Sequence, residues 1–392
     1  MVRLGDVVDD LRSGFACGID DPEGIVQFRM NNVERDGALN WTKTRRVPVK
    51  MLKKGLSLQP NDILLNATNS PDLVGKTALF VGADEPVTFS NHFLRLRIRA
   101  QAAEPSYVAR WLRRQFELGS FKAMCRSWVN QASITRDQVS NLEIPLPPLD
   151  EQKRIAAILD KADQLRQKRR QAIALLESLT QSIFLEMFGE ERSSGWPTAT
   201  VGEVALDIRT GPFGSQLLHS EFVDEGIAVL GIDNAVNNRF EWGKPRYISP
   251  KKYSDLARYT VRPGDVLITI MGTCGRCAIV PDDIPTSINT KHLCCITLDK
   301  RNIIPEYLHG CLLNAPSVLR QLGVQAKGAV MPGLNMGIVK SLSIPIPPLE
   351  LQKRFRATLE AALDRRRLLL IAAFADETLF SSLQHRAFTG QL

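Results

Sequence analysis

Gly75-Lys76-Thr77 looks like the end of a phosphate-binding loop, which would bind a nucleotide if it were complete. Such a loop needs a glycine five residues before Gly75, and Ser70 stands there. At the matching place in the second half of the chain, Gly275-Arg276-Cys277 lacks both the lysine and the hydroxyl residue. We therefore interpret both segments as glycine turns between strands, with Lys76 and Arg276 facing outward.

Cysteines in the second half have a spacing that zinc sites use. Two residues separate Cys274 from Cys277, and Cys294-Cys295 follow. Adjacent residues of a strand point to opposite faces, so Cys294 and Cys295 could not easily bind one ion together. The first half has no cysteine at the equivalent positions. We therefore predict small buried thiols and no metal site.

No group of residues predicts a catalytic centre. His92 and His292 recur at matching positions, but no Ser/His/Asp grouping is recognised, so we interpret them as structural. Both Pro-Pro pairs lack the amide or acid and the aromatic residue with which an adenine methyltransferase holds a flipped base. No nuclease-type cluster of carboxylates and lysine is recognised either. The sequence argues against an enzyme.

Basic residues favour a polyanionic partner. The chain has 50 Lys and Arg against 42 Asp and Glu, a formal net charge of +8. Lysine and arginine would contact DNA phosphates, and arginine and amide side chains would read base edges. The candidates in the first half are Arg45, Arg46, Lys50, Lys53, Lys54, Lys122, Arg126, Gln131 and Arg136, with Asn31, Asn32 and Asn130 as further base readers.

The second half has a comparable set. For each of these residues, in both halves, a solvated basic face without a ligand is the alternative interpretation. The candidates in the second half are Lys244, Arg246, Lys251, Lys252, Arg258, Arg276, Lys291 and Lys327, with Asn234, Asn237, Asn238 and Gln325 as base readers.

These residues belong to a chain that repeats itself. Pro60-Asn61-Asp62 is echoed by Pro263-Gly264-Asp265, and Gln152-Lys153-Arg154 by Gln352-Lys353-Arg354, at a spacing that stays close to 200 residues. A repeat of this length means two copies of one unit. Between the matching positions, residues 33–54 and 236–258 share little beyond basic and aromatic character. This pattern fits one scaffold with two different reading surfaces.

Each copy ends in a proline-rich strap followed by a long helix, because proline ends an element and biases its predecessor to extended structure. Neither helix can bury its apolar stripe alone, so we expect the two helices to pair; packing of each helix on its own globular half is the alternative. The first stripe is Ile155, Ile158, Ala162, Leu165, Ala172, Leu176, Leu179 and Ile183; the second, looser stripe is Phe355, Leu359, Ala362, Leu369, Ala373, Phe380 and Leu383.

The expected fold class is α+β, without the regular alternation of a doubly wound sheet. Residues 63–65, 78–81 and 93–98 read as strands and 105–118 as a helix. We predict a first globular domain over 1–148, a helix over 149–190, a second globular domain over 191–347 and a second helix over 348–392. The opening residues lack a signal peptide and no apolar run could span a bilayer, so we expect a cytoplasmic chain with reduced cysteines and no membrane partner.

Four segments carry a resemblance to a known family. They are IPLPPLDEQKRIAAILDKADQLRQKR at 144–169, IPIPPLELQKRF at 344–355, the closing AFTGQL and the turn Gly211-Pro212-Phe213-Gly214-Ser215. With them, the whole chain resembles the DNA-specificity subunits of type I restriction–modification systems. Arg365, Arg366 and Arg367 in the middle of the second helix depart from the family pattern.

The resemblance implies two target-recognition domains separated by helices that form an antiparallel coiled coil. Each domain would read one half of a split, asymmetric site in double-stranded DNA. The helices would set the gap and dock two methyltransferase (modification) subunits, which restriction/translocase subunits join. The resemblance implies no cofactor in this chain, and S-adenosylmethionine and ATP with Mg²⁺ in the partners. The implied spacer and docking residues are Gln152, Arg154, Ile155, Leu159, Leu165, Leu176, Gln352, Arg354, Phe355, Leu359, Leu369 and Phe380.

Two other functions remain open. One is a helical scaffold protein without a role on DNA. The other is a specificity subunit of a methylation-only or phage-defence system.

Overall fold

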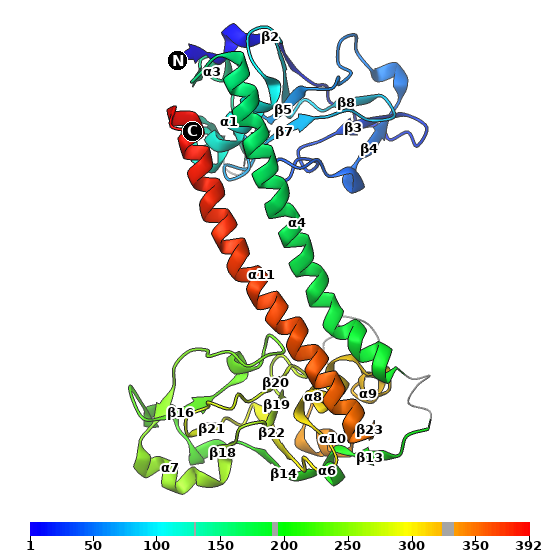
Figure 1. Cartoon of the computed structure of the whole chain (residues 1–392), viewed down its shortest axis with the longest axis vertical. Coiled ribbons are helices and arrows are strands. Elements are labelled where there is room, and N and C mark those ends of the chain that lie inside the picture. Colours follow the sequence, from blue (N-terminus) through cyan, green and yellow to red (C-terminus); the bar gives the residue numbers. More distant parts are fainter. Residues whose placement is uncertain (129–130, 190–194, 324–332) are drawn as a thin grey trace. The chain divides into compact units, whose positions relative to one another are not determined.

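The computed structural model describes residues 1–128, 131–189, 195–323 and 333–392. The chain folds into two compact units, Met1–Arg170 with Ile371–Leu392, and Gln171–Leu370. Each unit joins an α+β domain to one end of two long helices, which confirms the fold class and the tandem organisation (Figure 1). The domain bounds at 148, 190 and 347 stay predictions.

The long helices are α4 (Leu149–Phe188) and α11 (Leu349–Thr389). The domain of the first unit contains β1 (Val2–Arg3), β2 (Val8–Ser13), β3 (Ile25–Phe28), β4 (Arg45–Val47), β5 (Asp62–Asn66), β6 (Thr68–Asn69), β7 (Thr77–Phe80), β8 (Val87–Phe89), β9 (Phe93–Ile98), α1 (Pro105–Glu117), α2 (Ser120–Met124), β10 (Arg126–Trp128), β11 (Gln131–Ser133), α3 (Arg136–Ser140) and β12 (Glu143–Ile144).

The domain of the second unit contains β13 (Thr198–Thr200), α6 (Val201–Val204), β14 (Ala205–Thr210), β15 (Phe222–Val223), β16 (Ile227–Leu230), β17 (Tyr247–Ile248), α7 (Pro250–Leu256), β18 (Thr260–Val261), β19 (Val266–Thr269), β20 (Cys277–Ile279), β21 (Ser287–Asn289), β22 (Leu293–Leu298), α8 (Pro305–Asn314), α9 (Pro316–Gln321), α10 (Met336–Ser341) and β23 (Ser343–Pro345).

Both domains are built on the same antiparallel four-stranded sheet. Its order is β2-β9-β5-β7 in the first domain and β14-β22-β19-β20 in the second. A second sheet contains one parallel pair, β3 with β8 and β16 with β21 respectively. The strands and the helix predicted in the first half are confirmed as β5, β7, β9 and α1.

The central strands are buried on both faces, which explains their continuous apolar runs. Ile63 and Leu65 of β5 pack with α1 and the start of α4, whereas Leu64 between them packs with β3 and β8. Successive side chains of a strand point to opposite faces, so one strand supplies two cores. In the second domain β19 does the same, with Ile268 in one core and Leu267 in the other.

The proline strap before each long helix is fastened by the same two side chains in both copies. The Tyr107 hydroxyl donates to the Pro145 carbonyl (2.7 Å), and the Tyr307 hydroxyl to the Pro345 carbonyl (2.8 Å). Gln152 accepts from the Glu104 amide (2.9 Å) and donates to the Pro147 carbonyl (2.8 Å). Gln352 repeats this arrangement with the Ile304 amide (3.0 Å) and the Pro347 carbonyl (2.9 Å). Each strap therefore fixes where its helix begins.

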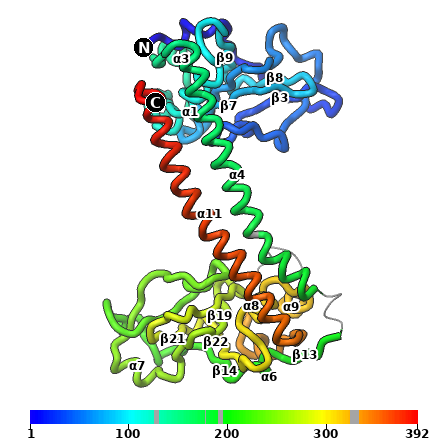
Figure 2. The backbone as a smooth tube through the Cα atoms, viewed as in Figure 1, coloured from blue at the N-terminus to red at the C-terminus, as the bar shows by residue number. Residues whose placement is uncertain are grey.

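The helices pair antiparallel in each unit (Figure 2). In the first unit, Arg154 near the start of α4 donates to the carbonyl of Leu392 at the chain's end (2.8 Å). In the second unit, the rings of Phe188 near the end of α4 and Phe355 near the start of α11 have centroids 5.3 Å apart. The predicted pairing of the two helices is thereby confirmed, and in both units their ends also pack on the adjoining domain.

Candidate nucleic-acid interface

Loops gather at one end of the main sheet of the first domain, and we call the segments 29–33, 66–71, 90–92 and 131–136 the first rim. The Ser90 amide donates to the Phe28 carbonyl (2.8 Å), and the Ala67 amide to the His92 carbonyl (2.8 Å). Ala132 pairs with Asn69, which brings the β10–β11 hairpin to the same end. Exposed side chains there are Met30, Asn31, Asn91, Gln131, Thr135 and Arg136.

The second domain has a matching second rim, formed by segments 210–216, 230–234, 270–276 and 290–292. The Thr290 amide donates to the Leu230 carbonyl (2.9 Å), and the Ile270 amide to the His292 carbonyl (2.9 Å). Exposed side chains there are Phe213, Ser215, Gln216, Met271, Thr273 and Arg276.

A glycine is required directly after β2 in the first domain and directly after β14 in the second. A Cβ added at Gly14 would lie 2.1 Å from the Phe89 carbonyl oxygen, and one added at Gly211 would lie 1.9 Å from the Asn289 carbonyl oxygen. No side chain fits such an approach, so the residue that follows each of these strands must be glycine.

Charge distinguishes the rims from an ordinary loop surface. The four segments of the first rim contain no aspartate or glutamate. The second rim contains one, Asp233, and its carboxylate is paired with Arg246 (2.5 Å). A surface of amides and arginines without free carboxylates can accept DNA phosphates and read base edges. The rims are therefore the parts of each domain best suited to DNA.

Of the first-half candidates, the structure places Gln131 and Arg136 on the rim. Arg45 and Arg46 lie in β4 and are used internally: Arg45 bonds to Asp20 and the Cys17 carbonyl, and Arg46 to Glu85 and the Gly24 carbonyl. For Arg126 the structure gives the strand position alone, and Asn130 lies outside the described residues. Lys50, Lys53 and Lys54 are exposed, and no ion pair joins them to the described residues.

Of the second-half candidates, Arg276 lies exposed on the second rim and Lys291 half-buried beside it. Arg246 supports the rim from within, and Lys252 is paired with Glu221 (2.6 Å). Arg258 stacks on Tyr259 with its guanidinium carbon 4.7 Å from the ring centroid. Lys327 and Gln325 lie outside the described residues, and the exposed lysines here are Lys244 and Lys251.

Asn32 and Asn234 are not base readers, contrary to the prediction. Both are buried, and both use the amide to close the loop in which they lie. Asn32 accepts from the Arg29 amide (2.8 Å) and donates to the Asn40 carbonyl (2.8 Å). Asn234 accepts from the Gly231 amide (2.8 Å) and donates to the Glu241 carbonyl (2.9 Å). Their recurrence in both copies was a sign of this structural role. Asn237 and Asn238 are also bonded within the domain, to Glu241 and to the Cys277 amide.

The glycine turns between strands are confirmed, but the outward direction of Lys76 was wrong. Lys76 is 6% exposed, and its ammonium donates to the carbonyls of Met30 and Val33. Arg276 is exposed as predicted.

The cysteines of β22 have structural positions, whereas the structural role of His92 and His292 stays a prediction. Cys294 and Cys295 lie on opposite faces of β22 and pack in different cores, as the strand geometry predicted. Burial raises the pKa of the Cys294 thiol to about 12. Within the described residues no group of three or more His, Cys, Asp and Glu could hold a metal ion. No described helix is long and apolar enough to cross a membrane.

The first domain is joined to the long helices by buried ion pairs. Asp163 of α4 is 4% exposed and accepts from Arg110 (2.7 Å) and Arg113 (2.9 Å) of α1. Arg166 bonds to Asp163 (3.2 Å) and to Glu377 of α11 (2.5 Å). Burial alone would raise the pKa of Asp163, but Arg113 and Arg110 outweigh it and hold the pKa below its ordinary value of 3.8.

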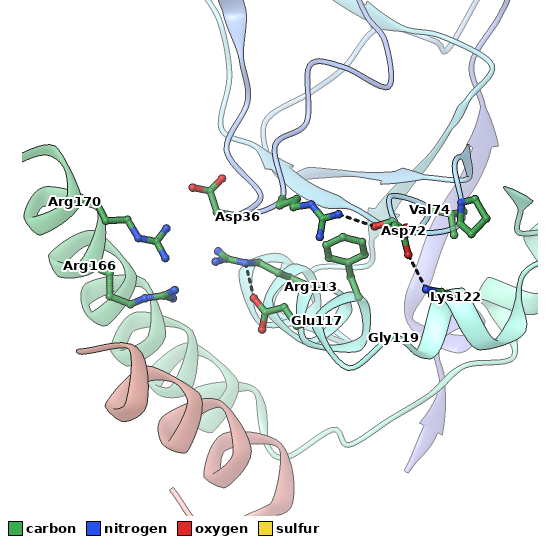
Figure 3. A pocket seen from close by; sticks show the side chains of 12 residues that line it. Asp36, Asp72, Val74, Arg113, Glu117, Gly119, Lys122, Arg166 and Arg170 are labelled. Carbon is green, nitrogen blue, oxygen red and sulfur yellow. Dashed lines mark hydrogen bonds and ion pairs between the residues drawn. The ribbon is translucent and has the colours of Figure 1, made fainter. Parts of the chain in front are cut away.

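A cavity of about 480 Å³ opens beside these ion pairs (Figure 3). Arg113, Arg166 and Arg170 line it and point toward it, together with Asp36. Each of these arginines is already neutralised, Arg113 by Glu117 and Asp163, and Arg166 and Arg170 by Glu377. Arg35 lines the cavity as well, and its guanidinium donates to the Asp72 carbonyl (3.4 Å). The arginines that face the cavity from α1 and α4 thus belong to the ion-pair network.

The second domain is joined to the helices by aromatic packing instead. Phe184 and Phe188 of α4 meet Phe355 of α11 and Tyr307 of α8, with ring centroids 4.7 to 6.1 Å apart. Gly310 makes room for this cluster, because a Cβ there would lie 2.5 Å from the Phe184 ring. One scaffold therefore uses charge at one junction and apolar surface at the other.

The predicted spacer residues divide between seam and surface. Leu165 was placed on the seam and is instead 54% exposed, because Asp163 and Arg166 occupy the buried positions of that turn. Gln152 and Gln352 are buried in the straps, and Arg154 and Arg354 are exposed. Residues that are buried or half-buried as predicted are Ile155, Leu159, Leu176, Phe355, Leu359, Leu369 and Phe380.

A family model described as "Type I restriction modification DNA specificity domain" matches residues 43–175 and 195–368. The putative type I restriction enzyme MjaX specificity subunit of Methanocaldococcus jannaschii is 28% identical over 312 residues, which cover 76% of this chain and 71% of that protein. The MjaVIII specificity subunit of the same organism is 22% identical over 383 residues, covering 92% and 85%.

Solved structures show the same fold. The crystal structure of a type I restriction–modification system S subunit from M. genitalium has a TM-score of 0.59 at 15% identity and covers 99% of this chain and 95% of that chain. A chain from a structural study of complex assembly and conformational transition of the type I R-M system has a TM-score of 0.61 at 20% identity, covering 100% and 97%.

Replacing Asp163 by Asn should destabilise the first unit by about 3 kcal/mol, because buried arginines lose their charge partner. Hydrogen exchange of α1 and the first half of α4 at pH 7 measures the loss. Asp376→Asn is the matched control: its pair with Arg169 is partly exposed, so the loss should stay under about 1 kcal/mol.

The wild-type junction should also weaken in acid. The folded pKa of Asp163 lies below that of the unfolded carboxyl, so its contribution is complete above about pH 4 and is lost as pH falls through the folded value. A pH series of melts from 7 to 3 should show a smaller decline for Asp163→Asn. Equal declines for variant and wild type would contradict the role given to Asp163.

Proposed function

This chain belongs to the type I restriction–modification DNA specificity family, and on that premise we propose that each domain reads one half of a bipartite, asymmetric DNA site through its rim. One observation supports this proposal above others. The two rims share backbone hydrogen bonds at matching positions and lack free carboxylates, yet they expose different side chains. Equal scaffolds with unequal reading surfaces suit a site whose halves differ.

The exposed residues supply the two kinds of contact that such a site needs. Asn31, Gln131 and Arg136 on the first rim, and Gln216 and Arg276 on the second, would read base edges. Phosphate contacts would come from exposed lysines outside the rims, which position the protein without specifying sequence. These lysines are Lys50, Lys53, Lys54, Lys244 and Lys251.

In this proposal the long helices set the gap between the half-sites. The 40 residues of α4 make a helix about 60 Å long. At about 3.4 Å per base pair, this length limits the separation of the half-sites to about 18 base pairs.

Exposed apolar side chains on the helices support docking of modification subunits. In the first unit Leu165 (54% exposed), Ile371 (60%), Phe374 (77%) and Leu379 (56%) lie outside the seam. Apolar side chains gathered on a helix surface are typical of a protein interface. Methylation, with S-adenosylmethionine, and ATP- and Mg²⁺-dependent cleavage would reside in modification and restriction subunits, and this chain would be non-catalytic.

Exchanging residues 1–148 for those of a family member with another target should change one half of the methylated motif. Each rim is complete within its own domain, so the other half and the gap should stay unchanged. Sequencing of the methylated bases in DNA from cells that express the chimera gives the motif. A change in both halves would contradict the two-reader model.

The double variant Ile371→Ser/Phe374→Ser should weaken assembly with modification subunits roughly tenfold or more, because burying a large apolar side chain contributes about 1.5–3 kcal/mol. Sedimentation of the co-expressed complex measures assembly. His385→Ser, an exposed change on the same helix, should leave assembly unaltered.

The thermal midpoint of the double variant should match that of the wild type, since both side chains are exposed. Undiminished assembly would remove this surface from the docking site. If the wild-type complex bound DNA without any sequence preference, the result would favour the scaffold alternative.

A further inference from the structure

Lys76 is a buried cation whose hydrogen bonds go to backbone carbonyls and whose charge has no carboxylate partner. Its ammonium donates to the Met30 carbonyl (3.1 Å) and the Val33 carbonyl, and it forms no salt bridge with the described residues. The Asn66 side chain donates to the same Met30 carbonyl (3.1 Å). Burial lowers the pKa of Lys76, although Glu34 partly offsets this effect.

A lysine in this place is a poor choice for stability alone. A buried charge without a carboxylate partner loses its hydration, and an apolar side chain of similar length would fill the same space. Lys76 and Asn66 instead fix the position of the loop 29–33, because both bond to backbone carbonyls on one side of it. Asn32 closes that loop from within, through the Arg29 amide and the Asn40 carbonyl.

With its inner side held by these hydrogen bonds, the loop exposes its tip, Met30 and Asn31. Met30 is 38% exposed and Asn31 is exposed, beside the positively charged Arg29. The tip thus offers an amide, which can bond to two atoms of an adenine edge, next to an apolar side chain suited to a thymine methyl group.

We propose that Asn31 reads an adenine in the first half-site, with Met30 against the same or the neighbouring base pair, and that Lys76 is the positioning residue for this loop. The inference rests on the proposed function and deepens it.

The second domain anchors its equivalent loop in another way. Arg276 stands at the place of Lys76 and is exposed. The loop 231–234 is held by Arg246, which bonds to Asp233 (2.5 Å) and the Val229 carbonyl (3.3 Å). Loss of Lys76 should therefore disturb the first half-site and spare the second.

The test uses the full-length chain reconstituted with modification subunits and S-adenosylmethionine. Wild type, Asn31→Ala, Lys76→Met and the double variant methylate a DNA library that is degenerate across both half-sites, and the methylated molecules are sequenced. Arg99→Met is the matched control, because Arg99 is an exposed cation of the same domain that follows the end of β9, whereas the rim segment 90–92 precedes the start of that strand.

Asn31→Ala should lower discrimination at one A·T position of the first half-site by roughly tenfold to a hundredfold. Lys76→Met should relax that same position, and the double variant should be no worse there than Asn31→Ala, because both changes act through one contact. The second half-site should be read normally by all variants, and Arg99→Met should match the wild type.

Three results would overturn the inference. The first is an unchanged sequence preference at the first half-site with Asn31→Ala. The second is a uniform loss of methylation over all sequences with Lys76→Met. The third is an additive loss of discrimination in the double variant. If Lys76→Met does not fold, Asn31→Ala still decides whether the loop reads DNA, since its side chain is exposed. A wild-type complex without any sequence preference would instead refute the proposed function.

Discussion

A helix of about forty residues is stable in water when an apolar stripe along its length is covered, and α4 and α11 meet this requirement by packing against each other and against the domains. The pairing is antiparallel in both units. It also determines which side chains remain outside, because Phe374 and Leu165 are exposed where the seam residues are not. Everything proposed for the helices, as spacer and as docking surface, depends on this pairing.

The two junctions show how one scaffold can be used with different chemistry. The first joins helix and domain through Asp163 and its arginines, and the second through Phe184 and its aromatic neighbours. A buried ion pair contributes less stability than an apolar cluster of similar size, but fewer protein surfaces can pack against it, because the surface must supply the opposite charge. Because the two junctions differ, the helix surface on which each domain packs fits that domain and does not fit the other one.

Much of the fold could be predicted because the repeat displays its own constraints. Gln152 and Gln352 recur since each closes a strap, and the double prolines mark where α4 and α11 begin. Leu165 was misplaced because a heptad pattern counts apolar residues, whereas the actual seam includes Asp163 and Arg166, whose charges are cancelled by residues distant in sequence. Lys76 and Asn32 were misjudged for a similar reason: their partners are backbone carbonyls and amides of loops, which residue types do not reveal. The differing reading surfaces were predicted at residues 33–54 and 236–258, which lie almost wholly outside the rims. The rims could not be predicted, because their segments come together only through the strand order.

In the proposed function, this chain determines the DNA sequence on which its partners act. The most direct measurement is the map of N6-methyladenine in cells that carry the modification subunits, with and without the gene for this chain. We expect methylation of one split, asymmetric motif, with half-sites no more than about 18 base pairs apart, and we expect this methylation to disappear when the gene is removed. A methylation map that is the same in both strains, with the chain produced and assembled, would contradict the proposed function.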